Sequence, residues 1–582
     1  MRKFLLTGIL AGLTLLSACK KEQMATEMRP AQGGKFYGGT YRVNELAELR
    51  SLDPIQVNDV VSSKISDQIY DRLLMLDENL KLQPQLAERW EVSPDGMTYT
   101  YYLRRGVKFH DSPAFPEGKG RELTAEDVRY SYTRLCDPRA GTLNFGYVAE
   151  KVKGAQEFFK SVQEAQKSGG EPTIKEVTGF KVIDPYTFAI ELVKPFAPFE
   201  FYPSLTSFGI HPREAVEHFK GDFRFHPVGT GPFVFESWAP DRNLVLKRNP
   251  TYWAKDNAGN QLPFLDEIQF TFMKDEKTQL LEFKQGNHEE SYRIPNEFFA
   301  DIVDENKNAK GEYTKFKVLH EQTLATQFYG MLTTDPVFKD KRIRQAISYA
   351  VDRDRIIRYV LKGQAGGPGN HGLVPPSVPD YNAQSITGYA FNAQKAKELM
   401  AQAGYPDGKG FPAITLQLNA GGGRNTAVAE AIQSMLSQNL GITVNLNQVE
   451  FARHTQTIDE GKAPFYRLGW VGDYPDPETF LNLLYGKLVP ADPANISPIN
   501  STRFQNAEFD RLFEQALSTT DRLKRFELYR QAEQIAINEA PMLIVFYDED
   551  YRLLQPYVED YRGNPMDTRF YRYVWLNPAK RK

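Results

Sequence analysis

One stretch of the chain limits its possible folds more than any other. Two runs of alternating apolar residues flank a helical segment at residues 426–439, namely Ile414, Leu416 and Leu418 before it and Ile442, Val444 and Leu446 after it. A strand, a helix and a second strand of these lengths predict a parallel pair joined by a crossover helix. Amphipathic helices at residues 343–351 and 392–403 accompany this unit, so the chain after about residue 330 is predicted to be α/β.

The first half of the chain has a different pattern. Residues 89–92 and 98–103 alternate in polarity around Ser93, Pro94, Asp95 and Gly96, which predicts a hairpin. Thr124 is positioned to cap a helix that Pro138 ends. Polar residues 160–173 are expected to form an exposed helix and loop. After Val182 the pattern returns to strands, with proline and glycine between them, up to about residue 272.

The N-terminus predicts export. Arg2 and Lys3 precede an uncharged run that ends at Ala18 and is too short to span a bilayer. Leu16, Ser17, Ala18 and Cys19 resemble the bacterial lipobox, so Cys19 is the expected lipidation site after removal of residues 1–18. An ordinary signal peptide with a chance cysteine is the alternative. Residues 19–37 are polar and predict a tether to the membrane.

Charge and cysteine content narrow the function classes. Loss of residues 1–18 would change the formal net charge from -3 to -5, which argues against nucleic acid as a partner. Only Cys136 remains after Cys19, so no disulfide can form within a monomer and buried cores must supply the stability.

Two candidate ligand contacts follow predicted strands of the α/β region. Gly422, Gly423 and Arg424 lead from the first strand of the βαβ unit into its helix, where free backbone N–H groups and a guanidinium favour a carboxylate. Asp473 follows the strand at residues 465–470 and could bind an ammonium. Each segment could equally be an ordinary turn with a solvated charge. Ligands of open parallel sheets bind beyond the carboxyl ends of the strands, where both segments are expected to lie. Because the two segments carry opposite charges, together they suit a zwitterionic ligand.

Enzyme and metal signatures are missing from the sequence. It contains no Gly-x-Ser-x-Gly elbow, no His-Glu-x-x-His pair and no Cys-x-x-Cys. His211, His218 and His226 have no carboxylate or cysteine at a recognised ligand spacing. We therefore expect no catalytic residues, no metal and no cofactor.

Several motifs, in order along the chain, resemble the family 5 extracellular solute-binding proteins. They are LAERWEVSPDG at 86–96, LRRGVKFHD at 103–111, TAEDV at 124–128, PVGTGPF at 227–233, NPTYW at 249–253, RQAISYA at 344–350 and WVGDYPDP at 470–477. The resemblance extends from about residue 40 to the C-terminus. It departs at Ser112, where the family usually has glycine, and in the longer loop at 113–121.

The resemblance implies a type II periplasmic-binding-protein fold, in which hinge strands join two lobes and one lobe carries an additional domain. The implied boundaries are a first lobe of residues 38–84, 182–292 and 543–582, an additional domain of 85–181 on that lobe, and a second lobe of 293–542. The chain is expected to cross between the lobes near residues 290 and 541.

The resemblance also implies a function. Family members include the oligopeptide and dipeptide receptors of ABC importers, and in peptide-binding members the aspartate that matches Asp473 pairs with the peptide's amino terminus. Trp470 and Tyr474 are further candidate contacts from the same motif, although Trp470 could equally pack in the core. We expect a monomeric, lipid-anchored receptor on the periplasmic or extracellular side that delivers short peptides to a permease. The alternatives are another ligand (nickel, haem, a sugar or an opine), a peptide sensor without transport, and a secreted hydrolase.

Overall fold

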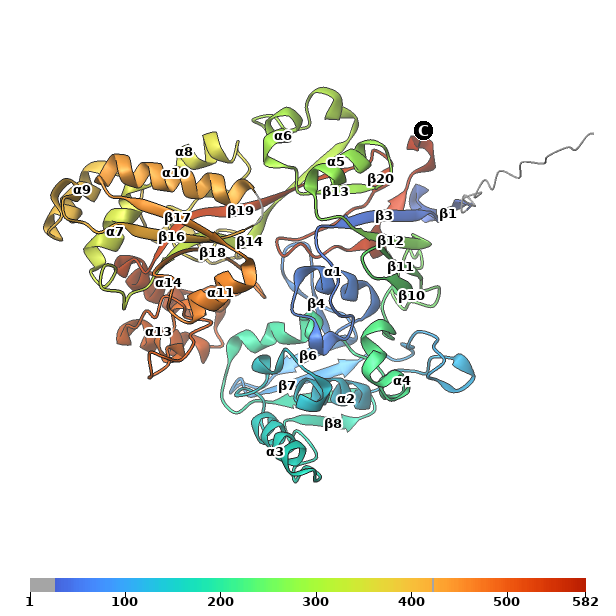
Figure 1. Ribbon diagram of the computed structural model, residues 1–582. Helices are drawn as coiled ribbons and strands as arrows, with labels where there is room; N and C mark the ends of the chain where they lie inside the picture. The colour runs from blue at the N-terminus through green and yellow to red at the C-terminus, as the bar shows by residue number, and fades with distance from the viewer. Residues whose placement is uncertain (1–26, 421–422, 582) are drawn as a thin grey trace, which may run out of the picture.

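The computed structural model describes residues 27–420 and 423–581. The predicted signal peptide, Cys19 and Gly422 therefore lie outside the described residues. Two lobes stand side by side with a smaller domain below them (Figure 1). This arrangement is the predicted two-lobed fold with an additional domain.

The first lobe is built on a four-stranded sheet. Its order is β10 (Phe233–Ala239), β11 (Asn243–Arg248), β12 (Glu267–Phe272) and β3 (Thr40–Glu45). The inward residues Tyr41, Val43, Ile268 and Phe270 are fully buried. Helix α1 (Val60–Ile69) packs on this sheet through Ile65.

The additional domain contains the predicted hairpin and capped helix. Its sheet has the order β6 (Ala87–Val92), β7 (Thr98–Leu103), β9 (Thr187–Glu191) and β8 (Phe180–Asp184). Helix α2 (Ala125–Leu135) starts at a capping box of Thr124 and Asp127, and α3 (Ala155–Ser168) forms the predicted exposed helix. Helix α4 (Arg213–Phe219) completes the domain beside α2 (Figure 1).

The second lobe and the connection between the lobes share one seven-stranded sheet. Its order is β13 (Glu290–Tyr292), β19 (Met542–Leu554), β14 (Lys317–Met331), β18 (Phe465–Val471), β16 (Ile414–Asn419) and β17 (Val444–Val449), with β15 (Gly367–Pro368) beside β19. Strands β16 and β17 are parallel, as predicted, and α10 (Gly423–Leu440) connects them. The helix begins three residues before the predicted start at Thr426.

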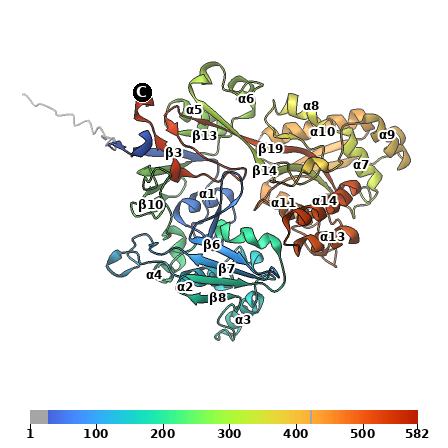
Figure 2. The same cartoon turned by 180° about the vertical axis from the view of Figure 1, so that it is seen from behind.

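Helices cover the rest of the second lobe. They are α7 (Lys341–Ala350), α8 (Arg353–Arg355), α9 (Ala393–Gln402), α11 (Phe451–Asp459), α12 (Glu478–Leu481), α13 (Ala507–Leu517) and α14 (Arg522–Glu539). Seen from behind, α13 and α14 lie on the side that faces the additional domain (Figure 2). Phe201 and Tyr202 of that domain contact Tyr474 of the second lobe, with ring centroids 6.0 and 5.4 Å apart.

Two long strands join the lobes. β14 and β19 pair along most of their length, and the register shifts between Gln322 and Thr326. The chain thus enters the second lobe along β14 and returns along β19, which begins where the second crossing was expected. The first crossing does not lie near residue 290, because β13 only runs beside the end of β19. Helices α5 (Glu276–Lys284) and α6 (Asn296–Ile302) pack against that end through Leu553. The lobe boundaries read from the sequence stay a prediction.

Candidate functional site

Asp473 lies in a turn that the surrounding core holds in place. Strand β18 ends at Val471, and the N–H of Gly472 donates to the carbonyl of Leu324 at 2.7 Å. A Cβ atom at residue 472 would come within 2.8 Å of the buried Leu324 side chain, so this position requires glycine. The N–H of Asp473 donates to Thr479 Oγ1 at 3.3 Å. These contacts direct the Asp473 side chain into the space between the lobes.

The Asp473 carboxylate lines a cavity of about 300 Å³, which we call the Asp473 cavity. The opposite wall comes from the first lobe and the additional domain, including Val57, Asp59 and Ser207. Within residues 27–420 and 423–581, no side chain forms an ion pair or hydrogen bond with this carboxylate. The side chain remains open to solvent on one side, yet protein atoms surround the rest of it, and this desolvation raises the pKa of Asp473 to about 6. The Asp473 carboxylate thus has no positively charged partner among the described residues.

The two cations that line the Asp473 cavity are already paired. Arg72 contacts Asp67 at 2.6 Å, and Lys64 contacts Asp567. Neither cation is therefore free to neutralise Asp473, and neither would compete with a cationic ligand for it.

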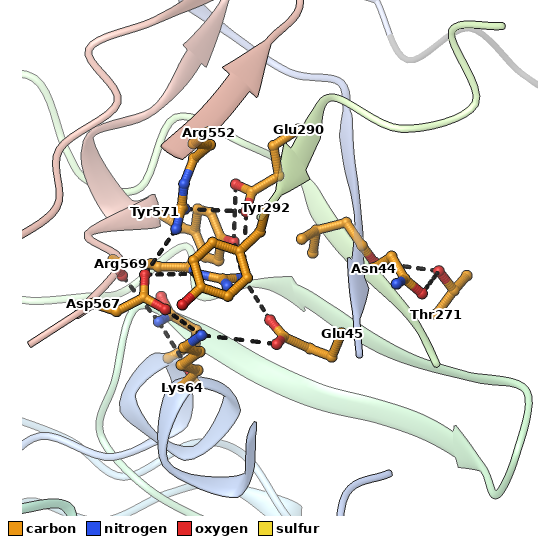
Figure 3. Close-up of polar contacts among 12 residues, drawn as sticks. Asn44, Glu45, Lys64, Thr271, Glu290, Tyr292, Arg552, Asp567, Arg569 and Tyr571 are labelled. Carbon is orange, nitrogen blue, oxygen red and sulfur yellow. Dashed lines mark hydrogen bonds and ion pairs between the residues drawn. The ribbon is translucent and has the colours of Figure 1, made fainter. Parts of the chain in front are cut away.

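Lys64 and Asp567 belong to a buried cluster of charges where the hinge strands meet the first lobe (Figure 3). We call it the hinge ion cluster, and its members are Glu45, Lys64, Glu290, Arg552, Asp567 and Arg569. Arg552 bridges Glu290 at 3.1 Å and Asp567 at 2.7 Å. Arg569 contacts Glu45 and lies 3.3 Å from Glu290. The cluster ties β13 and β19 to β3 and α1.

The pKa values in the hinge ion cluster reflect this mutual pairing. Burial alone would raise the pKa of Asp567, but Lys64, Arg569 and Arg552 outweigh it and lower that pKa strongly. Burial tends to lower the pKa of Arg569, whereas Glu45 and the other anions around it hold it well above its usual value. Asp567 and Arg569 therefore remain charged across the physiological pH range.

Arg424 and Gly423 line a different cavity, of about 830 Å³, between α10, α6 and the hinge strands. The Arg424 guanidinium donates to Asp548 at 2.8 Å and to the carbonyl of Gln364 at 3.0 Å. Neither partner was predictable from the sequence. The structure thus places Arg424 in a second pocket, with part of its hydrogen-bonding capacity already used.

Arg467 also lines this second cavity, and sequence analysis overlooked it. Its guanidinium donates to the side-chain oxygens of Asn419, at 3.2 Å, and Gln327. Both partners are neutral, and no carboxylate among the described residues forms an ion pair with Arg467. The available signal was an arginine in the middle of a half-buried strand. We call this pocket the Arg467 cavity.

Strand β18 has an unpaired edge between these two cavities. It pairs with β14 along its whole length, from Phe465 to Val471. On its other side it pairs with β16 only at Phe465 and Tyr466, and the carbonyl of Arg467 accepts a hydrogen bond from His454 Nε2 of α11 at 2.8 Å. No strand of the described chain covers that side of residues 467–471. Such an edge can accept main-chain hydrogen bonds from an extended chain.

The other two aromatic candidates face the protein interior. The Trp470 indole donates to Thr479 Oγ1 at 3.4 Å and packs against the core. Tyr474 is buried and its hydroxyl donates to Glu478, whose pKa burial raises to about 7. Neither side chain lines the Asp473 cavity or the Arg467 cavity. They hold the turn that carries Asp473.

Metal-binding clusters and membrane-spanning helices are absent from the described chain. No group of three or more histidine, cysteine or carboxylate side chains within it is placed to hold a metal ion. No helix in the same residues combines the length and apolar character required to cross a bilayer.

Residues 81–490 match the family described as bacterial extracellular solute-binding proteins, family 5. The chain belongs to this family. Heme-binding protein A of Haemophilus influenzae is 29% identical over 568 residues, which cover 96% of this chain and 95% of that protein. The periplasmic oligopeptide-binding protein OppA of Salmonella typhimurium is 28% identical over 549 residues, or 92% of each chain.

Among solved structures, the periplasmic binding protein DppA of Helicobacter pylori in complex with the peptide STSA is similar. It superposes with a TM-score of 0.72 at 25% identity and covers 93% of this chain and 98% of that chain. Both the two-lobed fold and the family membership are therefore those expected from the sequence motifs.

Proposed function

We propose that this protein is an exported receptor that captures short peptides between its lobes and delivers them to an ABC permease. The observation that carries the proposal is the unpaired Asp473 carboxylate at the end of the unpaired β18 edge. Family relatives named for oligopeptide binding support it. The protein would do no covalent chemistry.

The unpaired edge explains how one site can accept many sequences. An extended peptide beside residues 467–471 would complete the sheet through its main chain, which every peptide shares. Its ammonium would pair with Asp473, and its carboxylate would face the guanidinium groups of Arg467 and Arg424. Side chains would project into the cavities on either side.

Binding is proposed to close the two lobes about β14 and β19. The hinge ion cluster fixes one end of these strands to the first lobe, so the bending would fall near the register shift at Gln322. In this scheme the boundary proposed from the sequence at 542/543 is kept, and the boundary proposed at 292/293 is moved into β14, along which the chain enters the second lobe. Lipidation at Cys19 would keep the monomeric receptor on a bacterial membrane beside its permease.

A relative named for haem binding raises a second ligand class. Among the described residues that line the two cavities there is no histidine or cysteine, whereas Tyr147, Met566 and Tyr551, whose side-chain types can also ligate haem iron, are present. The unpaired Asp473 carboxylate favours a ligand with an ammonium group, such as a peptide. Native mass spectrometry of protein purified from its host distinguishes the two, because peptides would appear as masses spaced by amino-acid residues.

The decisive experiment replaces Asp473 with Asn and measures binding of one tripeptide in free and N-acetylated forms. Losing the carboxylate would leave a buried ammonium unpaired, so the free peptide should bind about a few hundredfold more weakly. The acetylated peptide has no ammonium and should lose little. Equal losses for both peptides would refute the role of Asp473.

Arg467→Met provides the matched test at the other end. It should weaken a peptide with a free carboxyl terminus much more than its C-terminal amide, while the response to N-acetylation stays as in the unsubstituted protein. Recovery of cleaved fragments from the same incubations would instead indicate a hydrolase. Peptide uptake that persists after deletion of the gene would indicate a sensor.

A further inference from the structure

The Asp473 cavity has an apolar part that faces solvent from both lobes. Val60 at the start of α1 and Val471 at the end of β18 are 55% and 53% exposed. Both line this cavity, although they come from opposite sides of the cleft. Leu205 and Met566 extend the apolar lining. An aliphatic chain placed between the two valines would remove apolar surface from water on both sides.

The charged part of the same cavity is unbalanced. Once the pairs Arg72–Asp67 and Lys64–Asp567 are set aside, Asp59 and Asp473 remain. Asp59 accepts hydrogen bonds from the backbone N–H and the hydroxyl of Ser62, at 2.9 and 2.7 Å. Neither Asp59 nor Asp473 has a cation partner within the described chain. The first lobe and the second lobe thus each present one unneutralised carboxylate to a single cavity.

We propose that the Asp473 cavity is a side-chain subsite that prefers a lysine or arginine as the first residue of the bound peptide. This inference rests on the proposed function. The peptide's ammonium would take Asp473, its aliphatic stem would lie between Val60 and Val471, and the cationic end would reach Asp59. The receptor would therefore favour peptides that carry two positive charges at their amino end.

The physical chemistry of long cationic side chains fits this lining. Lysine and arginine bury an apolar stem while the charged end stays in a polar, solvated place. Asp59 is such a place, because it is half-buried at the cavity wall. A glutamate at the same peptide position would meet two carboxylates and no free cation, which disfavours it. A neutral aliphatic side chain would use the valines alone.

The test measures dissociation constants for three tripeptides that differ only in the first residue, Lys-Ala-Ala, norleucine-Ala-Ala and Glu-Ala-Ala. Norleucine has a stem like that of lysine without the charge. Lysine should bind about fivefold tighter than norleucine, in line with a partly exposed ion pair, and glutamate should bind most weakly. Raising the salt concentration should shrink the difference between lysine and norleucine.

Two variants separate the charge from the apolar contact. Asp59→Asn keeps the cap of α1, since asparagine caps as well as aspartate, so the variant should fold. It should remove the preference for lysine over norleucine and leave norleucine binding within about twofold. Val60→Ser should weaken the binding of the lysine peptide and of the norleucine peptide by the same factor. Asp521→Asn, at the cap of α14 away from both cavities, is the matched control and should leave the preference intact.

The outcomes distinguish this inference from the function on which it rests. Equal binding of the three peptides, or an unchanged lysine preference in Asp59→Asn, would overturn the subsite while peptide binding stands. Binding of none of a diverse set of peptides would overturn the proposed function itself. A lysine preference lost in Asp59→Asn and kept in Asp521→Asn would support the subsite.

Discussion

Two neighbouring regions of this protein treat charge in opposite ways. In the hinge ion cluster, three cations and three carboxylates are buried together and each has at least one partner of opposite sign. In the adjoining cavity, Asp473 has none. Lys64 and Asp567 belong to both regions. Because they pair with each other, Lys64 does not neutralise Asp473. A charge that the protein leaves unneutralised is the one to examine for a ligand, whereas charges paired with each other report on architecture.

The largest effect on stability is expected when one partner is removed from the hinge ion cluster. Arg569→Met would leave two cations to face three buried carboxylates, so it should lower the free energy of unfolding by about 3 to 5 kcal/mol. Chemical denaturation followed by tryptophan fluorescence measures this loss.

The control is Arg511→Met on the exposed face of helix α13, where Arg511 pairs with Glu508 at 2.7 Å. It should change the stability by less than about 1 kcal/mol. If both variants unfold at the same denaturant concentration, the cluster does not have the structural role assigned to it.

The second prediction concerns the pH dependence of peptide binding. The free protein has a pKa of about 6 at Asp473, and a peptide ammonium beside it would lower that pKa. Binding is therefore strongest above pH 6 and is lost as the pH falls through it, by about tenfold between pH 7 and pH 5. The peptide ammonium stays protonated over this range.

Calorimetric titrations at several pH values measure this slope, and Asp473→Asn should flatten it. A slope that persists in Asp473→Asn would assign the pH dependence to another group. Asp567 should contribute little, because its neighbouring cations hold its pKa well below this range.

The smallest expected effect is on the stability of the unliganded protein. A carboxyl group whose folded pKa lies above its unfolded value destabilises the folded state at neutral pH and does so less as the pH falls. Asp473→Asn should thus raise the free energy of unfolding at pH 7 by less than about 1 kcal/mol, because the group is partly solvated. The unfolding temperature should rise slightly as a result. Thermal denaturation at pH 7, pH 5 and pH 4 measures it, and the gain should fall by about half at pH 5 and become small only below about pH 4. A lower unfolding temperature at pH 7 would mean that Asp473 has a stabilising partner.

Local patterns were sufficient to predict much of this structure. Alternating polarity located β6, β7, β16 and β17, the capping residue Thr124 located the start of α2, and amphipathic spacing located α9. Partners of charged groups were not predictable, because Glu45 and Arg569 meet across most of the sequence. For the same reason Arg424 could not be matched to Asp548, and Arg467 was overlooked inside a strand chosen for its apolar residues. Periodicity shows which face a residue occupies and says nothing about what arrives opposite it.

The uncovered side of β18 has a consequence for the behaviour of the protein in a crowded compartment. An open strand edge is a template for other extended chains and so invites aggregation. Here the stretch is only five residues long, half-buried for most of that length, and interrupted by a glycine at residue 469. A long unfolded chain could form only a few main-chain hydrogen bonds with so short an edge, whereas a short peptide could pair with all of it.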